Sequence, residues 1–372
     1  MYLKTIDLTN YRGYERTHLD FPDGITVISG KNAQGKTNLL ESVFFCCSGK
    51  SHRNAKEDEI ILFGVEYSIL KAVFERNHVA HDVEITLQRE KRKRILFDGA
   101  RISRTSEFVG QMKSVLFSPD NILIVKDSPA RRRNYMDVAL SQVFRGYLKL
   151  LIDYNKTLAM RNALLKEGPG HSGWKTMDVF ESQLAHYGAR IMAARRNFCE
   201  EAGKEAETIQ NRISGGEDTL TVTYSPNVES EATEEENRLL EEIGRNREKD
   251  IFRRTTTVGP HRDDILLLVN GKDAKSYASQ GQQRTAALSI KMAELSFMRK
   301  YTGENPILLL DDVFGELDAK RRQQLLTAVD DCQVILICTN IDSLPIDQRR
   351  IQAHFDVENG VISPARNRQK TL

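Results

Sequence analysis

A glycine-rich loop carries the most specific chemical pattern in the chain. Residues 30–37 read Gly-Lys-Asn-Ala-Gln-Gly-Lys-Thr and fit the spacing G-x-x-x-x-G-K-[ST]. A phosphate must be approached by bare backbone, which glycine permits, and the N–H groups and dipole of a helix start favour the anion. Lys36 is then placed to reach the β and γ phosphates, and the Thr37 hydroxyl to bind Mg²⁺. The pattern predicts a nucleoside triphosphate site formed by Gly30, Lys31, Asn32, Ala33, Gln34, Gly35, Lys36, Thr37 and Asn38.

The elements on either side must hold this loop in place. Before it, Ile25, Val27 and Ile28 form an apolar run of strand length. After it, apolar residues between Leu39 and Phe44 recur with helical spacing. This order of strand, loop and helix is the context that the pattern requires. It favours a phosphate-binding loop over a simple glycine-rich turn.

Two acids follow another apolar run far along the chain. The residues from Pro306 to Leu310 predict a fully buried strand, which ends in Asp311 and Asp312. A carboxylate at a strand end beside a phosphate loop suits a Mg²⁺ ligand, and its neighbour can orient an attacking water. We therefore expect Asp311 to bind the metal and Asp312 to act in catalysis. A further buried run, Val334–Ile337, fits a doubly wound sheet with its chemistry at the carboxyl ends of the strands.

Three other segments have readable structure. Alternating residues predict antiparallel strands at 68–74, 82–88 and 94–97, with a hairpin turn at Asp98-Gly99. Residues 279–284 (Ser-Gln-Gly-Gln-Gln-Arg) predict a capped helix start. Residues 214–250 contain a short Thr/Val strand and a Glu-rich stretch that reads as a solvated helix or linker.

Heptad-like spacing predicts a helical arm in the middle of the chain. Apolar residues repeat with coiled-coil spacing from Ala130 to Lys166 and again from Phe180 to Phe198. A Gly/Pro-rich break at 168–173 separates the two helices, so they must run antiparallel. At 1.5 Å per residue the arm would be on the order of 50 Å long.

Basic residues gather in two places, and each has two interpretations. Such runs are commonly solvated, but they also suit contacts with a nucleic-acid backbone. Arg12, in the turn after the first strand, also has two interpretations: it contacts nucleotide or DNA, or it is a solvated turn residue. His52 is a weaker candidate for a functional role. The clustered candidates for DNA binding are Arg92, Lys93, Arg94, Arg131, Arg132 and Arg133.

Composition sets broad limits. A chain of 372 residues is too long for one compact core, and 54 basic against 52 acidic residues leave a net charge of +2. Five cysteines without a C-x-x-C pair fit a reducing compartment. No signal region is readable at the N-terminus, and no apolar run approaches the roughly 18 residues of a membrane span. We expect a cytoplasmic protein with no membrane partner.

The order of these motifs resembles the ATP-binding-cassette head shared by SMC proteins and their relatives. More closely, the chain is similar to the RecF family of bacterial DNA replication and repair proteins. Gly-Pro-His-Arg-Asp-Asp at 259–264 and Ser-Pro-Ala-Arg-Arg-Arg at 128–133 are the most specific signs of that family. The other stretches that carry the resemblance are 10–14, 30–38, 49–53, 117–120, 279–284 and 311–318.

The resemblance implies an α/β fold with an insertion. The expected fold is an ABC-type P-loop ATPase head, made of a mixed sheet with an antiparallel subdomain, plus an inserted helical lobe with a short antiparallel coiled-coil arm. The N-terminal part of the ATPase lobe would span residues 1–118. The helical lobe and arm would span 119–254, and the C-terminal part of the ATPase lobe 255–372.

The resemblance also implies a mechanism. ATP and Mg²⁺ would bind one subunit, and Ser279, Gln280, Gly281 and Gln282 of a facing subunit would cap the γ-phosphate, giving an ATP-dependent homodimer. Asp312 stands where many relatives have Glu and is one methylene shorter, so we expect slow ATP hydrolysis that acts as a switch. The dimer would clamp double-stranded and gapped or single-stranded DNA in repair, replication and the SOS response. It would help load recombinase together with recombination mediators such as RecR and RecO.

The chain departs from transporter-type cassettes at two places. Ser118 stands where those have a glutamine, for which Gln111 is a weak substitute, and Thr339 and Asn340 replace the switch histidine. The γ-phosphate sensor is therefore unassigned. An SMC-like chromosome-organising or nuclease-associated ATPase is the alternative function. The residues at these two positions disfavour a transporter subunit. A full SMC tether needs a far longer coiled coil than this chain has. A phosphate-loop kinase would not need the helix start at Ser279.

Overall fold

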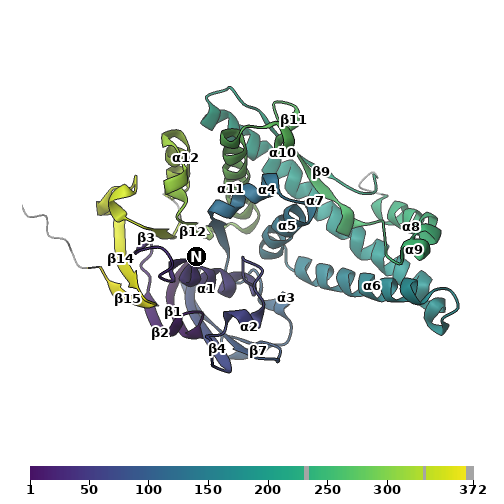
Figure 1. Ribbon diagram of the computed structural model, residues 1–372, viewed down its shortest axis with the longest axis horizontal. Helices are drawn as coiled ribbons and strands as arrows, with labels where there is room; N and C mark the ends of the chain where they lie inside the picture. Colours follow the sequence, from purple (N-terminus) through teal and green to yellow (C-terminus); the bar gives the residue numbers. More distant parts are fainter. Residues whose placement is uncertain (230–233, 330–331, 366–372) are drawn as a thin grey trace, which may run out of the picture. The chain divides into compact units, whose positions relative to one another are not determined.

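The computed structural model of the chain describes residues 1–229, 234–329 and 332–365. It divides into two compact units, each with its own internal contacts (Figure 1). The first unit is Met1–Asn121 with Met298–Leu372, and the second is Ile122–Phe297. The expected boundary at residue 118 falls close to this division, but residues 255–297 group with the second unit rather than with the ATPase lobe. The predicted Glu-rich stretch includes 230–233, which lie outside the described residues.

The first unit contains a six-stranded antiparallel sheet with the order β2-β1-β4-β5-β6-β7. Alternating burial along β1 and β4 directs one face of this sheet into the core. Asp98 and Gly99 have φ angles of 48° and 73°, so the hairpin turn expected there is confirmed. The strands are β1 (Tyr2–Tyr11), β2 (Tyr14–Asp20), β4 (Tyr67–Arg76), β5 (Val79–Gln88), β6 (Arg94–Phe97) and β7 (Ala100–Ile102).

The second sheet of this unit is mostly parallel and has the order β15-β14-β3-β13-β12-β8. The central strands β3, β13 and β12 are buried at every residue, as continuous apolar runs require when both faces are covered. Figure 1 shows the C-terminal strand β14 beside the N-terminal strand β3, and the two pair in parallel. The strands are β3 (Ile25–Ser29), β8 (Ser114–Phe117), β12 (Ile307–Asp311), β13 (Val334–Cys338), β14 (Ile351–Glu358) and β15 (Val361–Pro364).

Helices connect the strands of the first unit. α1 follows the glycine-rich loop and buries nearly all of its residues, because it packs against β4, β8, β12 and β13. No helix of residues 1–229, 234–329 and 332–365 is long and apolar enough to cross a membrane. The α-helices of this unit are α1 (Lys36–Ser48), α2 (Glu57–Ile60), α3 (Thr105–Phe108) and α12 (Ala319–Val329).

The second unit is mainly helical. α6 and α7 pack against each other as the predicted antiparallel pair, but α7 also packs against β9 and α8. The prediction of one continuous helix from Ala130 to Lys166 is wrong, because the chain breaks at 144–146, where Gly146 has φ 87°. The helices are α4 (Leu123–Lys126), α5 (Pro129–Val143), α6 (Tyr147–Glu167), α7 (Met177–Ser214), α8 (Glu235–Arg245), α9 (Arg247–Arg253), α10 (Ala274–Tyr277) and α11 (Gln280–Thr302), the last of which runs on into the first unit.

A three-stranded sheet explains why residues 255–297 group with this unit. β9 (Leu220–Ser225) pairs with β10 (Asp264–Val269) over the full length of both strands, and β10 pairs with β11 (Lys272–Asp273). Asn270 and Gly271 have φ angles of 52° and 74° and form the turn between β10 and β11. Non-local strand pairing therefore ties the segment before α11 to the helical lobe.

Candidate nucleotide site

The glycine-rich loop runs from the end of β3 to the start of α1 in a conformation that glycine makes possible. Gly30 and Gly35 have φ angles of 151° and 103°. A Cβ atom on Gly30 would lie 2.4 Å from the carbonyl oxygen of Val357, which belongs to β14. The Tyr14 hydroxyl donates a hydrogen bond to the Gly35 carbonyl oxygen at 2.9 Å. β14 therefore lies too close to Gly30 to admit a side chain there, and Tyr14 of β2 binds the backbone at the other end of the loop.

The start of α1 is open to an anion. Gly35 is the N-cap residue, and within the part of the chain that the structure describes no side chain caps this helix end. N–H groups of a first helical turn have no partner within their own helix, and the helix dipole makes that end positive. The loop thus presents backbone donors and a positive helix end at one place, which is the arrangement that binds phosphate.

Lys36 adds a positive charge beneath the loop. Its Nζ donates to the carbonyl oxygens of Gly30 at 2.7 Å and Lys31 at 2.8 Å, and the residue is buried. Burial lowers the pKa of Lys36, while the carboxylates of Asp312 and Asp311 oppose that shift. The ammonium group is therefore held against the loop, and among the described residues its hydrogen-bond partners are these two carbonyl oxygens.

Thr37 and Asp311 meet at the carboxyl ends of β3 and β12. The Thr37 hydroxyl donates to Asp311 Oδ1 at 3.1 Å. β13 lies between the two strands in the sheet, so the parallel order brings the loop and the acid to one edge. Burial raises the pKa of Asp311, and the hydrogen bond from Thr37 and the charge of Arg53 oppose that shift. A hydroxyl and a carboxylate at this distance fit two oxygen ligands of Mg²⁺.

Asp312 follows in a left-handed conformation with φ 50°. Its backbone N–H donates to the Ile337 carbonyl oxygen at 3.1 Å, which extends the pairing of β12 and β13 by one residue. Burial raises the pKa of Asp312, and the charge of Lys36 opposes that shift. A non-glycine residue in this backbone region is uncommon, and such residues concentrate at functional sites.

Several other predicted loop residues have structural partners. Gln34 Oε1 accepts a hydrogen bond from the Asn359 backbone N–H, in the turn between β14 and β15. Asn38 Oδ1 accepts from Arg53 Nη1 at 3.2 Å. Lys31, Asn32 and Ala33 are exposed.

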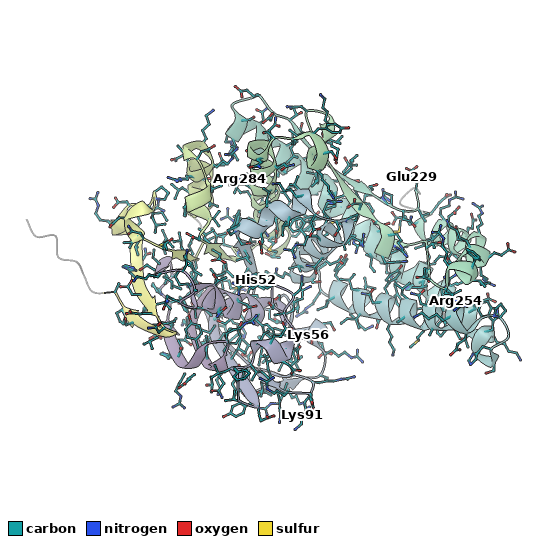
Figure 2. All side chains as sticks on the ribbon, in the orientation of Figure 1. His52, Lys56, Lys91, Glu229, Arg254 and Arg284 are labelled. Carbon is teal, nitrogen blue, oxygen red and sulfur yellow. The ribbon has the colours of Figure 1, made fainter. Side chains whose placement is uncertain are left out.

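Arg12 and His52 lie beside α1 in packed positions. Arg12 forms a bidentate ion pair with buried Glu41 on α1, with both N–O distances 2.9 Å, and Ser51 also donates to Glu41. The ion pair with Glu41 gives Arg12 a structural role, which differs from both interpretations of Arg12 made from the sequence. His52, labelled in Figure 2, packs edge-on against Phe44 with ring centroids 5.6 Å apart, and burial lowers the pKa of His52 to about 4.

The helix start at Ser279 belongs to the second unit. The Gln282 backbone N–H donates to Ser279 Oγ at 3.2 Å, and the Ser279 backbone N–H donates to Gln282 Oε1 at 2.9 Å. These reciprocal bonds form a capping box at the start of α11. Gln282 Nε2 also donates to Asp218 at 2.8 Å. Ser279 and Gln280 are exposed and Gly281 is half-buried.

Most of the basic candidates are engaged within the chain. Lys93 Nζ binds the Gly49 carbonyl oxygen and Glu57, each at 2.7 Å, and Arg94 pairs with Glu84 at 3.2 Å. Arg92 and Arg131 form no side-chain hydrogen bond or ion pair with any residue that the structure describes.

Arg132 and Arg133 join the two motifs that most favour the RecF resemblance. Buried Arg132 forms a bidentate pair with Asp264 at 2.6 and 2.7 Å, and Arg133 donates to the Asp263 carbonyl oxygen at 2.7 Å. Residues 128–133 and 259–264 therefore contact each other and connect α5 to the start of β10.

A buried polar network that we did not predict lies next to this junction. Arg195 pairs with Asp137 at 3.0 Å and donates to the Pro260 carbonyl oxygen at 2.7 Å. The Tyr224 hydroxyl and the Asn227 backbone N–H both donate to Asp263. Arg195 lies between the apolar heptad residues Ala194 and Phe198 of α7, and an arginine within an apolar repeat is the sequence signal that could have indicated this network.

Ser118 and Gln111, at the first departure from the cassette pattern, form local hydrogen bonds, and Thr339 and Asn340, at the second, line a cavity. The Ser118 backbone N–H donates to Asn121 Oδ1 at 2.9 Å, and Gln111 Nε2 donates to the Glu107 carbonyl oxygen at 3.3 Å. Thr339 and Asn340 line a cavity of about 720 Å³ together with Gly30, Lys31, His354 and Asp356. None of these contacts assigns a γ-phosphate sensor.

The fold and the loop define the class of the protein as an ATPase head of the SMC and RecF type. The family model described as RecF/RecN/SMC N terminal domain matches residues 2–362. The Smc head bound to the C-winged helix domain of ScpA has 14% identity and a TM-score of 0.56, and covers 98% of this chain and 97% of that one, which shows the fold alone.

Closer relatives define the family. The DNA replication and repair proteins RecF of Lachnospira eligens and Lachnoclostridium phytofermentans are 37% and 39% identical over 97% of this chain and 98% and 99% of their own. The solved structure of the recombination mediator protein RecF-ATP in the RecFOR pathway has 33% identity and a TM-score of 0.89, and covers 98% of this chain and 99% of that one. The chain belongs to the RecF family of DNA replication and repair proteins, and the ABC-type fold predicted from the motifs is confirmed.

Proposed function

We propose that the chain is an ATP-dependent DNA-binding switch of replication and recombinational repair. The observation that carries this proposal is the 3.1 Å hydrogen bond from Thr37 to Asp311, formed beside buried Lys36 and the open start of α1. Together these groups fit the phosphates of ATP and a Mg²⁺ ion. Thr37 and Asp311 would hold the metal, which when bound neutralises charge on the phosphates. The RecF relative solved with ATP supports the same ligand for this chain.

Hydrolysis would depend on Asp312. Its carboxylate is the second acid at the end of β12, where a base can position water for attack on the γ-phosphate. The aspartate side chain is short for that task, so hydrolysis is expected to be slow. Slow hydrolysis gives a long-lived ATP-bound state, which suits a switch.

The capping groups would come from a second copy of the chain. Ser279 and Gln280 are exposed at the capped start of α11, where the Ser279 hydroxyl and the positive end of the helix suit a γ-phosphate. ATP would then hold two copies together as a homodimer. Gln282 would act indirectly, since its side chain binds Ser279 and Asp218.

The dimer would act on DNA in the cytoplasm. Membership of a DNA replication and repair family supports DNA as the partner, and the RecFOR pathway named for a relative supports mediators such as RecO and RecR. Closure on gapped DNA would help load recombinase. Arg92 and Arg131 are the sequence candidates whose side chains form no described internal contact.

Lys36→Ala tests the proposed ATP site. Removing a buried ammonium group that faces phosphate should weaken ATP binding at least about tenfold, because hydrogen bonds to charged groups are strong. Equilibrium binding of a fluorescent ATP analogue measures this directly. Lys91→Ala, which removes an exposed cation outside the loop, is the matched control and should bind as the wild type does. Unchanged affinity in Lys36→Ala would refute the site.

A further inference from the structure

Helix α9 of the second unit has two faces of opposite character. On the inner face, Arg247 Nε donates to Glu181 at 3.1 Å, and Asp250 accepts from buried Arg161 at 2.7 Å. Ile251 packs against a buried apolar cluster. These contacts fix the helix against α6 and α7, so its outer face has a defined position.

The outer face carries cations around an exposed aromatic ring. Lys249, Phe252 and Arg253 stand at positions i, i+3 and i+4, which share one side of a helix, and Arg254 follows directly. Phe252 is 89% exposed. Among the residues that the structure describes, Lys249, Arg253 and Arg254 have no side-chain hydrogen bond or ion pair. Glu248 is the one acid on this side, so three cations against one carboxylate leave a net charge of +2.

Other arginines of this region behave differently. Arg238 and Arg245 on α8 both pair with Glu241 and Glu242. A cation cluster without acidic partners is therefore unusual for this part of the molecule. The exposed ring of Phe252 lies among these cations with most of its apolar surface in water.

The backbone at Arg254 has a conformation that is uncommon for arginine. Arg254 ends α9 in the left-handed conformation with φ 53°, where glycine or asparagine is preferred. A cation near a helix C-terminus also offsets the helix dipole, but Arg253 already supplies one. An arginine therefore occupies a position whose backbone conformation favours glycine or asparagine.

We propose that Lys249, Phe252, Arg253 and Arg254, the α9 patch, form a contact surface for DNA that exposes unstacked bases. The ring of Phe252 stacks on a base, and the three cations bind the flanking phosphates, which is how proteins hold single-stranded nucleic acid. The proposal rests on the DNA-linked function proposed above and assigns one DNA contact of that function to α9. The α9 patch binds the single-stranded part of a gap in preference to intact duplex.

DNA-binding titrations of the full-length chain with Mg²⁺ and ATP test the patch. The probes are a labelled single strand, a gapped duplex and a blunt duplex. Phe252→Ala should bind the single strand and the gap about tenfold more weakly and the duplex equally well, while Phe252→Tyr should restore binding. The double variant Arg253→Gln with Arg254→Asn keeps a residue that tolerates φ 53°. It should lower affinity at least about fivefold and reduce the salt slope by about 1.5 to 2.

Arg245→Gln is the matched control, since it removes an exposed arginine that already has acidic partners. It should keep the wild-type affinity and slope. Wild-type affinity and slope in the double variant would overturn the patch, as would equal weakening of all three DNAs by Phe252→Ala. ATP affinity should be unchanged in every variant. A wild-type chain that binds no DNA would instead refute the proposed function itself.

Discussion

Thr37 and Asp311 are 274 residues apart in the chain, yet the hydroxyl of one donates to the carboxylate of the other at 3.1 Å. Asp311→Asn preserves the shape of the side chain and removes the charge that would hold Mg²⁺. We predict that this variant loses Mg²⁺-dependent ATP affinity by at least about tenfold, while binding without Mg²⁺ changes little. ATP titrations with Mg²⁺ and with a chelator measure the difference. Asp347→Asn, at an exposed acid, is the control, and a wild-type Mg²⁺ response in Asp311→Asn would rule out this metal site.

Gly30→Ala should disrupt the loop. Its Cβ would lie 2.4 Å from the Val357 carbonyl oxygen, and φ 151° is unfavourable for alanine. We expect a loss of more than about 2 kcal/mol of unfolding free energy and much weaker ATP binding. Gly64→Ala has positive φ but open space around it, so it isolates the backbone effect and should lose about 1 kcal/mol. Equal stability losses in urea unfolding of the two variants would argue against the steric contact at β14.

Arg132 and Arg131 are neighbours with different environments. Arg132→Ala removes a bidentate, largely buried ion pair with Asp264 and should lower the free energy of unfolding by about 3 kcal/mol. Arg131→Ala removes a half-buried cation with no described partner and should change stability by less than about 0.5 kcal/mol. Chemical denaturation of both variants checks the contrast. Similar stability in both would show that the junction between the two motifs contributes little.

The pH dependence of stability should reveal His261. Its Nδ1 lies 2.7 Å from the Tyr154 hydroxyl, and burial lowers the pKa of His261 from 6.5 to about 4. The unfolded chain takes up a proton at higher pH than the folded chain, so the folded state loses stability as pH falls from 6.5 towards 4. The loss from this group is up to about 3 kcal/mol.

His261→Gln keeps a polar side chain that cannot titrate. The free energy of unfolding of the variant should therefore fall less between neutral pH and pH 4 than that of the wild type. Because other groups titrate in the same range, the difference between the two curves is the quantity to measure. Parallel curves would mean that the pKa of His261 is the same in the folded and unfolded states, which would contradict the lowered pKa.

Local patterns predicted the strand, loop and helix around residues 25–44 and the acids after β12, since these signals lie within short windows of sequence. The place of β13 between β3 and β12 was not readable, because strand order depends on contacts between distant segments. The same limit hid Glu41, which appears only as an acid within an apolar helix until Arg12 is seen beside it. The break at Gly146 was missed because apolar spacing continues on both sides of it.

Charge alone also misled the choice of basic residues. Arg132 reads as part of an exposed basic run, but its partner Asp264 comes from β10, far along the chain. The α9 patch was overlooked for the opposite reason, because its cations alternate with acids in sequence and separate only when the helix forms. Position on a folded surface, rather than density in the sequence, decides which cations are available.

The central claim is that ATP joins two copies, with Ser279 of one near the phosphate loop of the other. Sedimentation velocity of the wild type and of Ser279→Arg, with and without Mg²⁺ and ATP, tests it most directly. We predict that the wild type forms a dimer only with ATP, and that gapped DNA strengthens this dimer. Ser279→Arg should bind ATP normally and remain a monomer, because a large cation at the start of α11 blocks close approach. ATP-dependent dimerisation of Ser279→Arg, or a wild type that stays monomeric when saturated with ATP, would contradict the account.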